Sequence, residues 1–289
     1  MKTKIIINPI SGGGKNKDIE DIINKYLDKQ RFQYDIHITT HPLHAKEITK
    51  QAIKEDYEAI IGVGGDGTIN EIASEVIGTN ISIGIIPNGS GNGFAFHLGT
   101  KKNIKESVLQ LNSSQERTID TGIANGESFI NVSGIGFDAY IAKLFSISIE
   151  RGFLNYIKLI FKNLGYKAQD YTIEYNDQRR KINAILISFA NASQYGNNFR
   201  ISPDSKIDDG LIEFVIIKDM ARWKVPMFLL KIARGEIKKS PFVEIIQAKS
   251  MEIRSNEKII HLDGETKEIK KDVIINIHPK SLKVLMPNE

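Results

Sequence analysis

The sequence contains no cysteine, so the chain forms no disulfide and offers no thiolate to a metal ion. It also lacks any apolar run near the ~18 residues that a membrane-spanning helix needs. Its first apolar run, "IIINPI", follows "MKTK" without the apolar region and cleavage site of a secretory signal. The net charge is only +4, and no block of basic residues is present. We therefore expect a cytoplasmic protein that does not bind nucleic acid.

The composition, 41% hydrophobic and 26% charged residues, is that of a soluble globular protein. A chain of 289 residues suits two domains. Strands and helices alternate over residues 1–125, which predicts an α/β domain. Residues 126–280 read as short antiparallel strands with helical insertions, which predicts a β-sandwich, and the tail at about 281–289 is expected to pack back on the first domain.

The central motif of the first domain is "IIGVGGDGTINE", residues 60–71. A buried strand, a glycine turn and a helix follow one another here, and this geometry directs backbone N–H groups toward a phosphate. Asp66 lies in the turn, where a carboxylate facing a phosphate needs a metal ion or a proton to accept. The glycines also match G-x-G-x-x-G, but the motif follows a later strand and lacks the acidic residue that a dinucleotide site requires.

Two further glycine-rich loops follow predicted strands, "NPISGGGK" (8–15) and "PNGSGNGFAFHLG" (87–99). The first is not a Walker loop, because Asn16 follows Lys15, and taken alone it fits a flexible turn equally well. Thr40 follows another strand and suits either a ligand contact or a helix cap. Three glycine-rich loops at one edge of a parallel sheet together predict a polyphosphate site.

The second domain carries two acidic clusters and two apolar helical stretches. "SPDSKIDDGL" (202–211) suits a Mg²⁺ or Ca²⁺ site or a solvated turn, and "HLDGE" (261–265) is by itself an ordinary Asp-Gly turn. The helical stretches 139–165 and 221–234 suit either core or an anionic membrane surface. The strands are predicted at 129–132, 171–175, 181–188, 211–217, 242–247, 250–254, 258–262 and 273–278.

In order and spacing, "NPISGGGK", "GGDGTINE", "PNGSGNGFA", "IDTG", "PDSKIDDGL" and "HLDGE" resemble the diacylglycerol kinase catalytic family of bacterial lipid kinases, which includes sphingosine kinase-like enzymes. The resemblance covers nearly the whole chain. It implies an N-terminal three-layer α/β domain like that of NAD kinases, a C-terminal antiparallel β-sandwich, and an ATP site in the cleft between them.

The resemblance also implies roles for single residues. Asp66 matches an essential aspartate, and Asp263 and Glu265 match an acidic pair that organises Mg²⁺ and supplies the base, with Glu265 favoured over Asp66 as the base. Asp120 matches a residue linked through water to the catalytic Mg²⁺. A structural Mg²⁺ is implied at the Asp209 carboxylate and the carbonyls of Lys206 and Leu211. The implied ATP contacts are Asn8, Ser11, Gly12, Lys15, Thr40, Gly64, Gly65, Gly67, Thr68, Asn88, Gly89 and Ser90.

The expected activity is transfer of the γ-phosphoryl group of ATP to the hydroxyl of a lipid alcohol, with diacylglycerol as the first expectation. Gly93 stands where many relatives have an aspartate, and Asp138 falls where sphingosine kinase-like enzymes read a polar head. A sphingoid base or another lipid alcohol is therefore an alternative, followed by a soluble NAD kinase-like activity and an inactive nucleotide-binding regulator. We expect peripheral contact with an anionic membrane; whether the chain forms a homodimer stays open.

Overall fold

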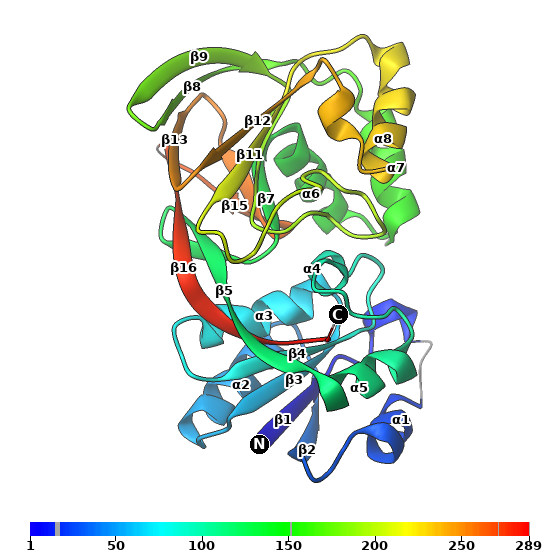
Figure 1. The fold of residues 1–289 in the computed structure, drawn as a ribbon. Helices are drawn as coiled ribbons and strands as arrows, with labels where there is room; N and C mark the ends of the chain where they lie inside the picture. The colour runs from blue at the N-terminus through cyan, green and yellow to red at the C-terminus, as the bar shows by residue number, and fades with distance from the viewer. Residues whose placement is uncertain (15–17, 151, 271, 289) are drawn as a thin grey trace. The chain divides into compact units, whose positions relative to one another are not determined.

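The computed structural model describes residues 1–14, 18–150, 152–270 and 272–288 (Figure 1). The chain forms two compact units, Met1–Ile119 with Lys280–Glu289, and Asp120–Pro279. Strands β5 (Gln115–Ala124) and β16 (Val273–Met286) each contribute residues to both units. None of the described helices is long and apolar enough to cross a bilayer.

The first unit is built on a parallel sheet in the order β2-β1-β3-β4. Its strands are β1 (Lys2–Ile7), β2 (Gln33–Ile38), β3 (Ala59–Gly64) and β4 (Ser82–Pro87), and the end of β16 pairs parallel with β4 at Lys283 and Val284. Every residue of β3 and β4 is buried, which explains their continuous apolar sequences.

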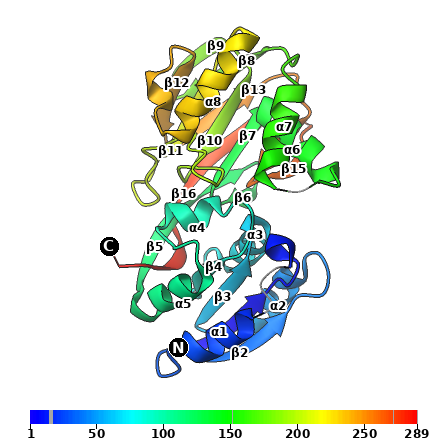
Figure 2. The same ribbon diagram turned by 90° about the vertical axis from the view of Figure 1, so that its right-hand side faces the viewer.

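Helices cover both faces of this sheet (Figure 2). Helices α1 (Ile19–Tyr26) and α5 (Ile104–Ser113) pack together and bury Ile23 and Leu111 against it. Helices α2 (His44–Lys54) and α3 (Asp66–Val76) pack together on the other face. The three layers predicted for this domain are confirmed.

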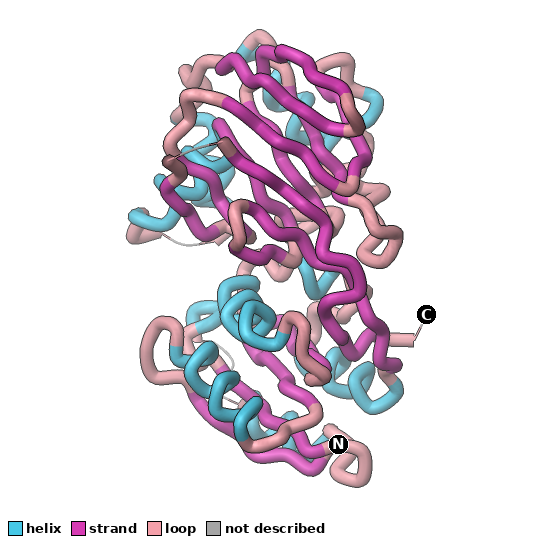
Figure 3. Tube along the Cα trace, turned by 90° about the vertical axis from the view of Figure 1, so that its left-hand side faces the viewer, coloured by secondary structure: helices cyan, strands magenta, loops and turns pink. Residues whose placement is uncertain are grey.

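The second unit is a sandwich of two antiparallel sheets (Figure 3). One sheet has the order β12-β11-β10-β7-β14-β15, and the other continues from β16 through β13 and β8 to β9. Side chains from both sheets form one buried core, including Ile135, Phe214, Ile173 and Ile253. The strands are β6 (Glu127–Phe129), β7 (Val132–Gly136), β8 (Gln169–Tyr175), β9 (Gln178–Ala184), β10 (Leu186–Ala190), β11 (Ile212–Ile217), β12 (Val243–Ala248), β13 (Ser250–Arg254), β14 (Ile259–Leu262) and β15 (Glu265–Glu268).

Helices α6 (Phe137–Ile147), α7 (Phe153–Lys162) and α8 (Val225–Ala233) lie on the outer face of the six-stranded sheet. Phe228 and Ile232 of α8 pack against Val215 and Ile217 of β11 in a second apolar cluster. The apolar helical stretches are thus partly core, as their periodicity indicates.

Two predicted strands are wrong. A strand at 129–132 does not form, because the backbone N–H groups of Ile130 and Asn131 donate to the Asp263 carboxylate instead of a neighbouring strand. A single strand at 181–188 is interrupted at Ile185, whose N–H pairs with Ile217 and whose carbonyl accepts from Phe137. At this residue the chain leaves one sheet for the other.

Candidate active site

The first unit has three glycine-rich loops, numbered here in chain order: the first follows β1, the second follows β3 and contains Asp66, and the third follows β4. These strands are neighbours in the sheet, and each loop leaves the carboxyl end of its strand. Ligands of open α/β sheets bind at this edge. The amide of Asn8 donates to Thr68 Oγ1 at 3.0 Å, which joins the first loop to the start of α3. Asn88 N donates to Gly64 O at 2.8 Å and joins the second loop to the third.

Glycine allows these loops to approach one another. Gly12 has φ 63°, and a Cβ on it would lie 2.8 Å from the carbonyl oxygen of Asn88. A Cβ on Gly89 would lie only 2.4 Å from the Cα of Gly65. Asn88 also donates to the carbonyl of Ser11 at 3.4 Å, so the predicted nucleotide residues of all three loops form one contiguous group.

The carboxylate of Asp66 lies against the short helix α4 (Gly93–His97), where its Oδ2 accepts from Asn92 N at 2.7 Å. Burial raises the pKa of Asp66, although the amides of Asn92, Phe94 and Gly93 oppose the rise. Asp66 therefore joins the second loop to the third. Asn92 strengthens this junction, because its side chain exchanges two hydrogen bonds with Gly89, at 2.9 Å and 2.8 Å.

The remaining predicted ATP contacts of the first unit differ in setting. Thr40 and Ser90 are exposed, and Gly67 has open space where a Cβ would lie. Lys15 lies outside the described residues.

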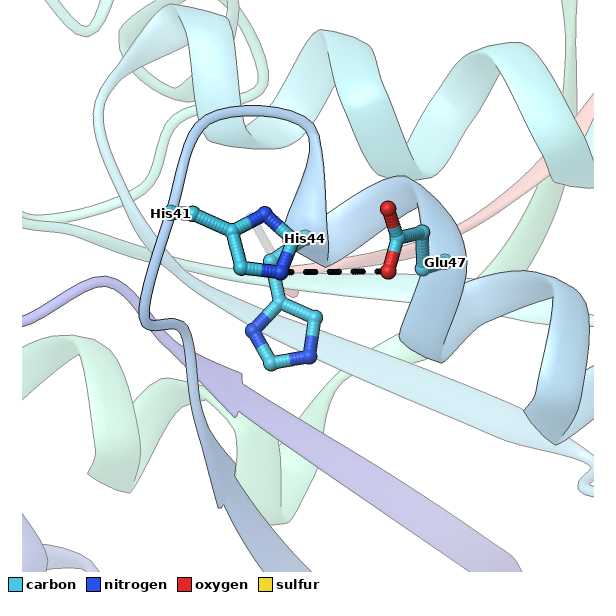
Figure 4. A group of neighbouring side chains, drawn as sticks. All are labelled: His41, His44 and Glu47. Carbon is cyan, nitrogen blue, oxygen red and sulfur yellow. Dashed lines mark ion pairs between the residues drawn. The ribbon is translucent and has the colours of Figure 1, made fainter.

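Thr40 leads into a cluster of His41, His44 and Glu47, in which one ligand atom from each residue lies within 4.8 Å of the others (Figure 4). The two rings stack at 4.4 Å, and His41 Nε2 lies 3.9 Å from Glu47 Oε2. Thr40 N donates to His44 Nδ1 at 3.0 Å, which leaves the hydrogen of a neutral ring on Nε2. His44 as placed therefore has no free lone pair for a metal ion, and the cluster is an exposed loop corner held by stacking and an ion pair.

In the second unit, Asp263 and Gly264 form the two-residue turn between β14 and β15, with φ of 49° and 91°. Positive φ at both positions is the geometry that Asp-Gly hairpin turns adopt. The Asp263 carboxylate accepts from Ile130 N at 2.9 Å and from Asn131 N at 2.8 Å, and its own N–H donates to Ser133 Oγ at 3.1 Å. The turn is thereby anchored, and it presents Glu265, which is exposed.

The loop that carries Lys206, Asp209 and Leu211 contains groups that fit a hard cation. Asp209 is exposed and accepts from Leu211 N at 3.0 Å, and the buried Asp120 accepts from Gly210 N at 2.7 Å. Glu213 is only 2% exposed, and its Oε2 has no hydrogen-bond partner among the described residues. Burial raises the pKa of Glu213, and the charge of Asp209 adds to the rise. Glu213 Oε1 accepts from Gln247 Nε2 at 3.0 Å, and a divalent cation with oxygen ligands would reduce the repulsion between Glu213 and Asp209.

Asp138 lies in the first turn of α6 at one side of an apolar pocket, and it is 4% exposed. The pocket is formed by α6, α7, α8 and the adjacent strands, with Ile160, Phe199 and Phe228 among its apolar residues. Tyr195 also lines it and donates to Asp138 Oδ2 at 3.1 Å. The sequence reasoning did not identify Tyr195, Ser188 or His261 beside Asp138. They come from separate strands and loops, so no local motif signals them.

Comparison with known proteins places both halves of the chain. The diacylglycerol kinase catalytic domain model matches residues 2–124, and the YegS C-terminal NAD kinase beta sandwich-like domain model matches residues 131–286.

Curated relatives have the same two-domain extent. A diacylglycerol kinase of Staphylococcus haemolyticus is 30% identical over 269 residues, covering 91% of this chain and 81% of the relative. One from Bacillus subtilis is 26% identical over 299 residues, with 100% and 97% covered. A probable lipid kinase YegS-like protein of Chromohalobacter salexigens is 27% identical over 226 residues, with 75% and 73% covered. The crystal structure of a diacylglycerol kinase from Bacillus anthracis matches the fold with a TM-score of 0.77 at 21% identity, covering 99% of this chain and 96% of that one.

Proposed function

The chain belongs to the diacylglycerol kinase family and is a lipid kinase, a transferase, and we propose that it transfers the γ-phosphoryl group of ATP to diacylglycerol, giving phosphatidic acid. The observation that carries the choice of a lipid acceptor is the apolar pocket of the second unit. Its lining is mostly aliphatic and aromatic, and its polar groups include those of Asp138, Tyr195, Asn163, Asp219 and Arg222. Such a lining suits acyl chains with a polar head at one end.

The glycine-rich loops are the part of the first unit that suits a triphosphate. Phosphates bind where backbone N–H groups and helix N-termini converge, and the loops after β1, β3 and β4 lie at one edge of the sheet together with the start of α3. In our proposal Asn8, Ser11, Gly12, Thr40, Gly64, Gly65, Gly67, Thr68, Asn88, Gly89 and Ser90 contact ATP, and Lys15 adds a positive charge.

Catalysis of phosphoryl transfer depends mainly on positioning and charge neutralisation. Mg²⁺, when bound, would offset negative charge on the phosphate oxygens. Asp263 is held in place by two backbone amides and fixes the turn. We assign Glu265 as the base that accepts the proton of the lipid hydroxyl, because it is the exposed carboxylate that this turn presents. Asp120 and Asp209 would serve the metal sites.

The surroundings of Asp138 favour an uncharged acceptor. Its carboxylate already accepts from Ala139 N at 2.9 Å, Ser188 Oγ at 3.0 Å and Tyr195 Oη at 3.1 Å. In addition, His261 Nε2 lies 3.2 Å from Asp138 Oδ2. Oδ2 thus already has two donors, and only Oδ1 has room for another, so this buried carboxylate is better suited to a single hydroxyl donor than to the three N–H groups of a sphingoid ammonium.

We also propose that α7 and α8 contact an anionic membrane. Residues of both helices line the pocket, whereas Leu154 of α7 is 85% exposed. Trp223, just before α8, is 77% exposed, and Ile149, before α7, is 99% exposed. Lys162 at the end of α7 and Lys224, whose Nζ lies 5.2 Å from the centroid of the Trp223 ring, add positive charge. Apolar and basic residues on one surface suit the boundary between head groups and acyl chains. Leu154→Ser with Trp223→Ser should reduce sedimentation with anionic vesicles, and unchanged binding would contradict this contact.

The test of function is transfer of radiolabelled phosphate from ATP to a panel of acceptors in detergent micelles: diacylglycerol, a sphingoid base, a monoacylglycerol and NAD. We expect labelled phosphatidic acid, dependent on Mg²⁺. Labelled NAD without any interface would indicate a soluble-substrate kinase. Absence of transfer to every acceptor would indicate a nucleotide-binding regulator and refute the proposal.

A further inference from the structure

Asp138 occupies a cradle that three adjacent strands build. In the sheet register Gly134 of β7 pairs with Ser188 of β10 on one side and with His261 of β14 on the other. Because Gly134 has no side chain, the carboxylate of Asp138 lies over it. A Cβ on Gly134 would be 2.2 Å from Asp138 Oδ2. Ser188 and His261 thus flank the carboxylate, and Tyr195 approaches it from the pocket.

The groups around Asp138 are donors. Burial, together with the charge of Asp138, raises the pKa of Tyr195, so its hydroxyl keeps its hydrogen. His261 is 2% exposed, and its ring contacts two different elements. Its Nδ1 accepts from Gly264 N at 3.2 Å, which places the hydrogen of the neutral ring on Nε2. That nitrogen lies 3.2 Å from Asp138 Oδ2, a close contact without the alignment of a hydrogen bond.

His261 therefore connects the Asp263–Gly264 turn to the lining of the pocket. Gly264 is the residue before Glu265, and its amide is held by the imidazole. The other ring nitrogen, Nε2, lies near the Asp138 carboxylate, which accepts a hydrogen bond from Tyr195 in the pocket. A displacement of Tyr195 or Asp138 by a chain in the pocket thus reaches the backbone of the turn through one buried ring. Misplacement of a reacting group by about 1 Å costs about 100-fold in rate.

We propose that His261 is a positioning residue for phosphoryl transfer, through which a lipid in the apolar pocket sets the placement of the turn that carries Glu265. The inference rests on the proposed function in that it takes Glu265 to act on the lipid hydroxyl. It goes beyond that function by assigning the ring a role that depends on what fills the pocket.

His261→Asn separates the two contacts of the ring. Asparagine Oδ1 stands where histidine Nδ1 does and accepts from Gly264 N, but its side chain is too short to reach Asp138. With diacylglycerol of long chains, assayed below the melting transition of the variant, we expect kcat to fall about 10- to 100-fold while KM for ATP stays near wild type. The smaller side chain at this buried position should also lower the melting temperature, but that loss is the same whichever lipid is assayed. With dihexanoylglycerol, whose chains fill less of the pocket, the fall should be several-fold smaller. His37→Asn, the same change at a half-exposed position of β2, is the control. An equal fall with both lipids, or none, would overturn the proposal.

A double variant tests the path through Asp138. Asp138→Asn alone should show the same preference for loss with long chains, and combining it with His261→Asn should add little, because both changes interrupt one connection. Effects that multiply would mean that the two residues act separately and would overturn the proposal.

Hydrogen exchange gives a readout that needs no turnover. A diacyl ester of propanediol, which has the chains but no acceptor hydroxyl, should slow exchange of the amides at 262–266 in the wild type and not in His261→Asn. Missing protection in an active wild type would refute this inference alone. Protection in a wild type that phosphorylates no lipid alcohol would refute the proposed function and support the connection.

Discussion

Two Asp-Gly pairs carry the carboxylates on which the proposed chemistry depends, and they are built differently: Asp66 is the first residue of α3, whereas Asp263 lies in a hairpin turn. Asp66 in the first unit accepts from the amide that precedes a short helix, and burial raises its pKa. Asp263 in the second unit, which has the same intermediate exposure as Asp66, binds two successive amides with separate oxygens. The first arrangement places a charge where ionisation costs folding free energy. The second uses the charge to fasten a turn. The proposed catalytic role explains why Asp66 is kept despite this cost, whereas the anchoring of the turn already explains much of the need for Asp263.

The largest effect that tests this contrast is expected at Asp66. A carboxylate with a raised folded-state pKa stabilises the fold in its neutral form, and this contribution is lost as the pH rises through that pKa. Asp66→Asn should therefore abolish measurable transfer without lowering the melting temperature at neutral pH. A variant with wild-type transfer would remove Asp66 from catalysis, and a large fall in melting temperature would assign it a structural role.

Glu265 and Asp263 should separate chemistry from anchoring within one turn. Glu265→Gln is expected to lower kcat about 10²- to 10⁴-fold, with the fold intact, because the base is lost at an exposed position. Asp263→Ala should in addition lower the melting temperature, because Ile130 N and Asn131 N lose their acceptor. Steady-state kinetics with thermal melts of both variants tests this. Equal melting temperatures would contradict the anchoring role, and wild-type turnover in Glu265→Gln would exclude it as the base.

The contrast also explains what the sequence could predict. Strand, glycine turn and helix are local signals, and the layers of the first unit follow from apolar runs such as Ile83 to Ile86. The sandwich was predicted as a class, but its strand ends depend on distant partners. Ile130 and Asn131 leave the strand pattern because of Asp263, more than 130 positions later. His261 and Asp138 are likewise far apart in the sequence and meet only in the fold, so the sequence alone does not show that they are neighbours.

Two glycines of the first unit offer a matched pair for the next largest effect. A Cβ on Gly89 would collide with the backbone of Gly65 at 2.4 Å, so Gly89→Ala should cost about 1–3 kcal/mol of unfolding free energy. Gly67 lies in α3 with nothing near its absent Cβ, so Gly67→Ala should stabilise by about 0.4–1 kcal/mol. Urea unfolding measures both. Equal stabilities would contradict the close packing of the loops. A raised KM for ATP in a stable Gly67→Ala would indicate that phosphate occupies this space.

The smallest effect is expected at the loop with Asp209, where a cation would act on stability more than on chemistry. Asp209 is exposed, but the buried Glu213 nearby has an oxygen without a partner among the described residues. Added Mg²⁺ should raise the melting temperature of the wild type, and Asp209→Ala should lose most of that rise while turnover changes little. Asp208→Ala, at the adjacent exposed carboxylate, is the control and should keep the rise. If Mg²⁺ shifts the melting temperature of neither the wild type nor the control, the loop holds no structural cation.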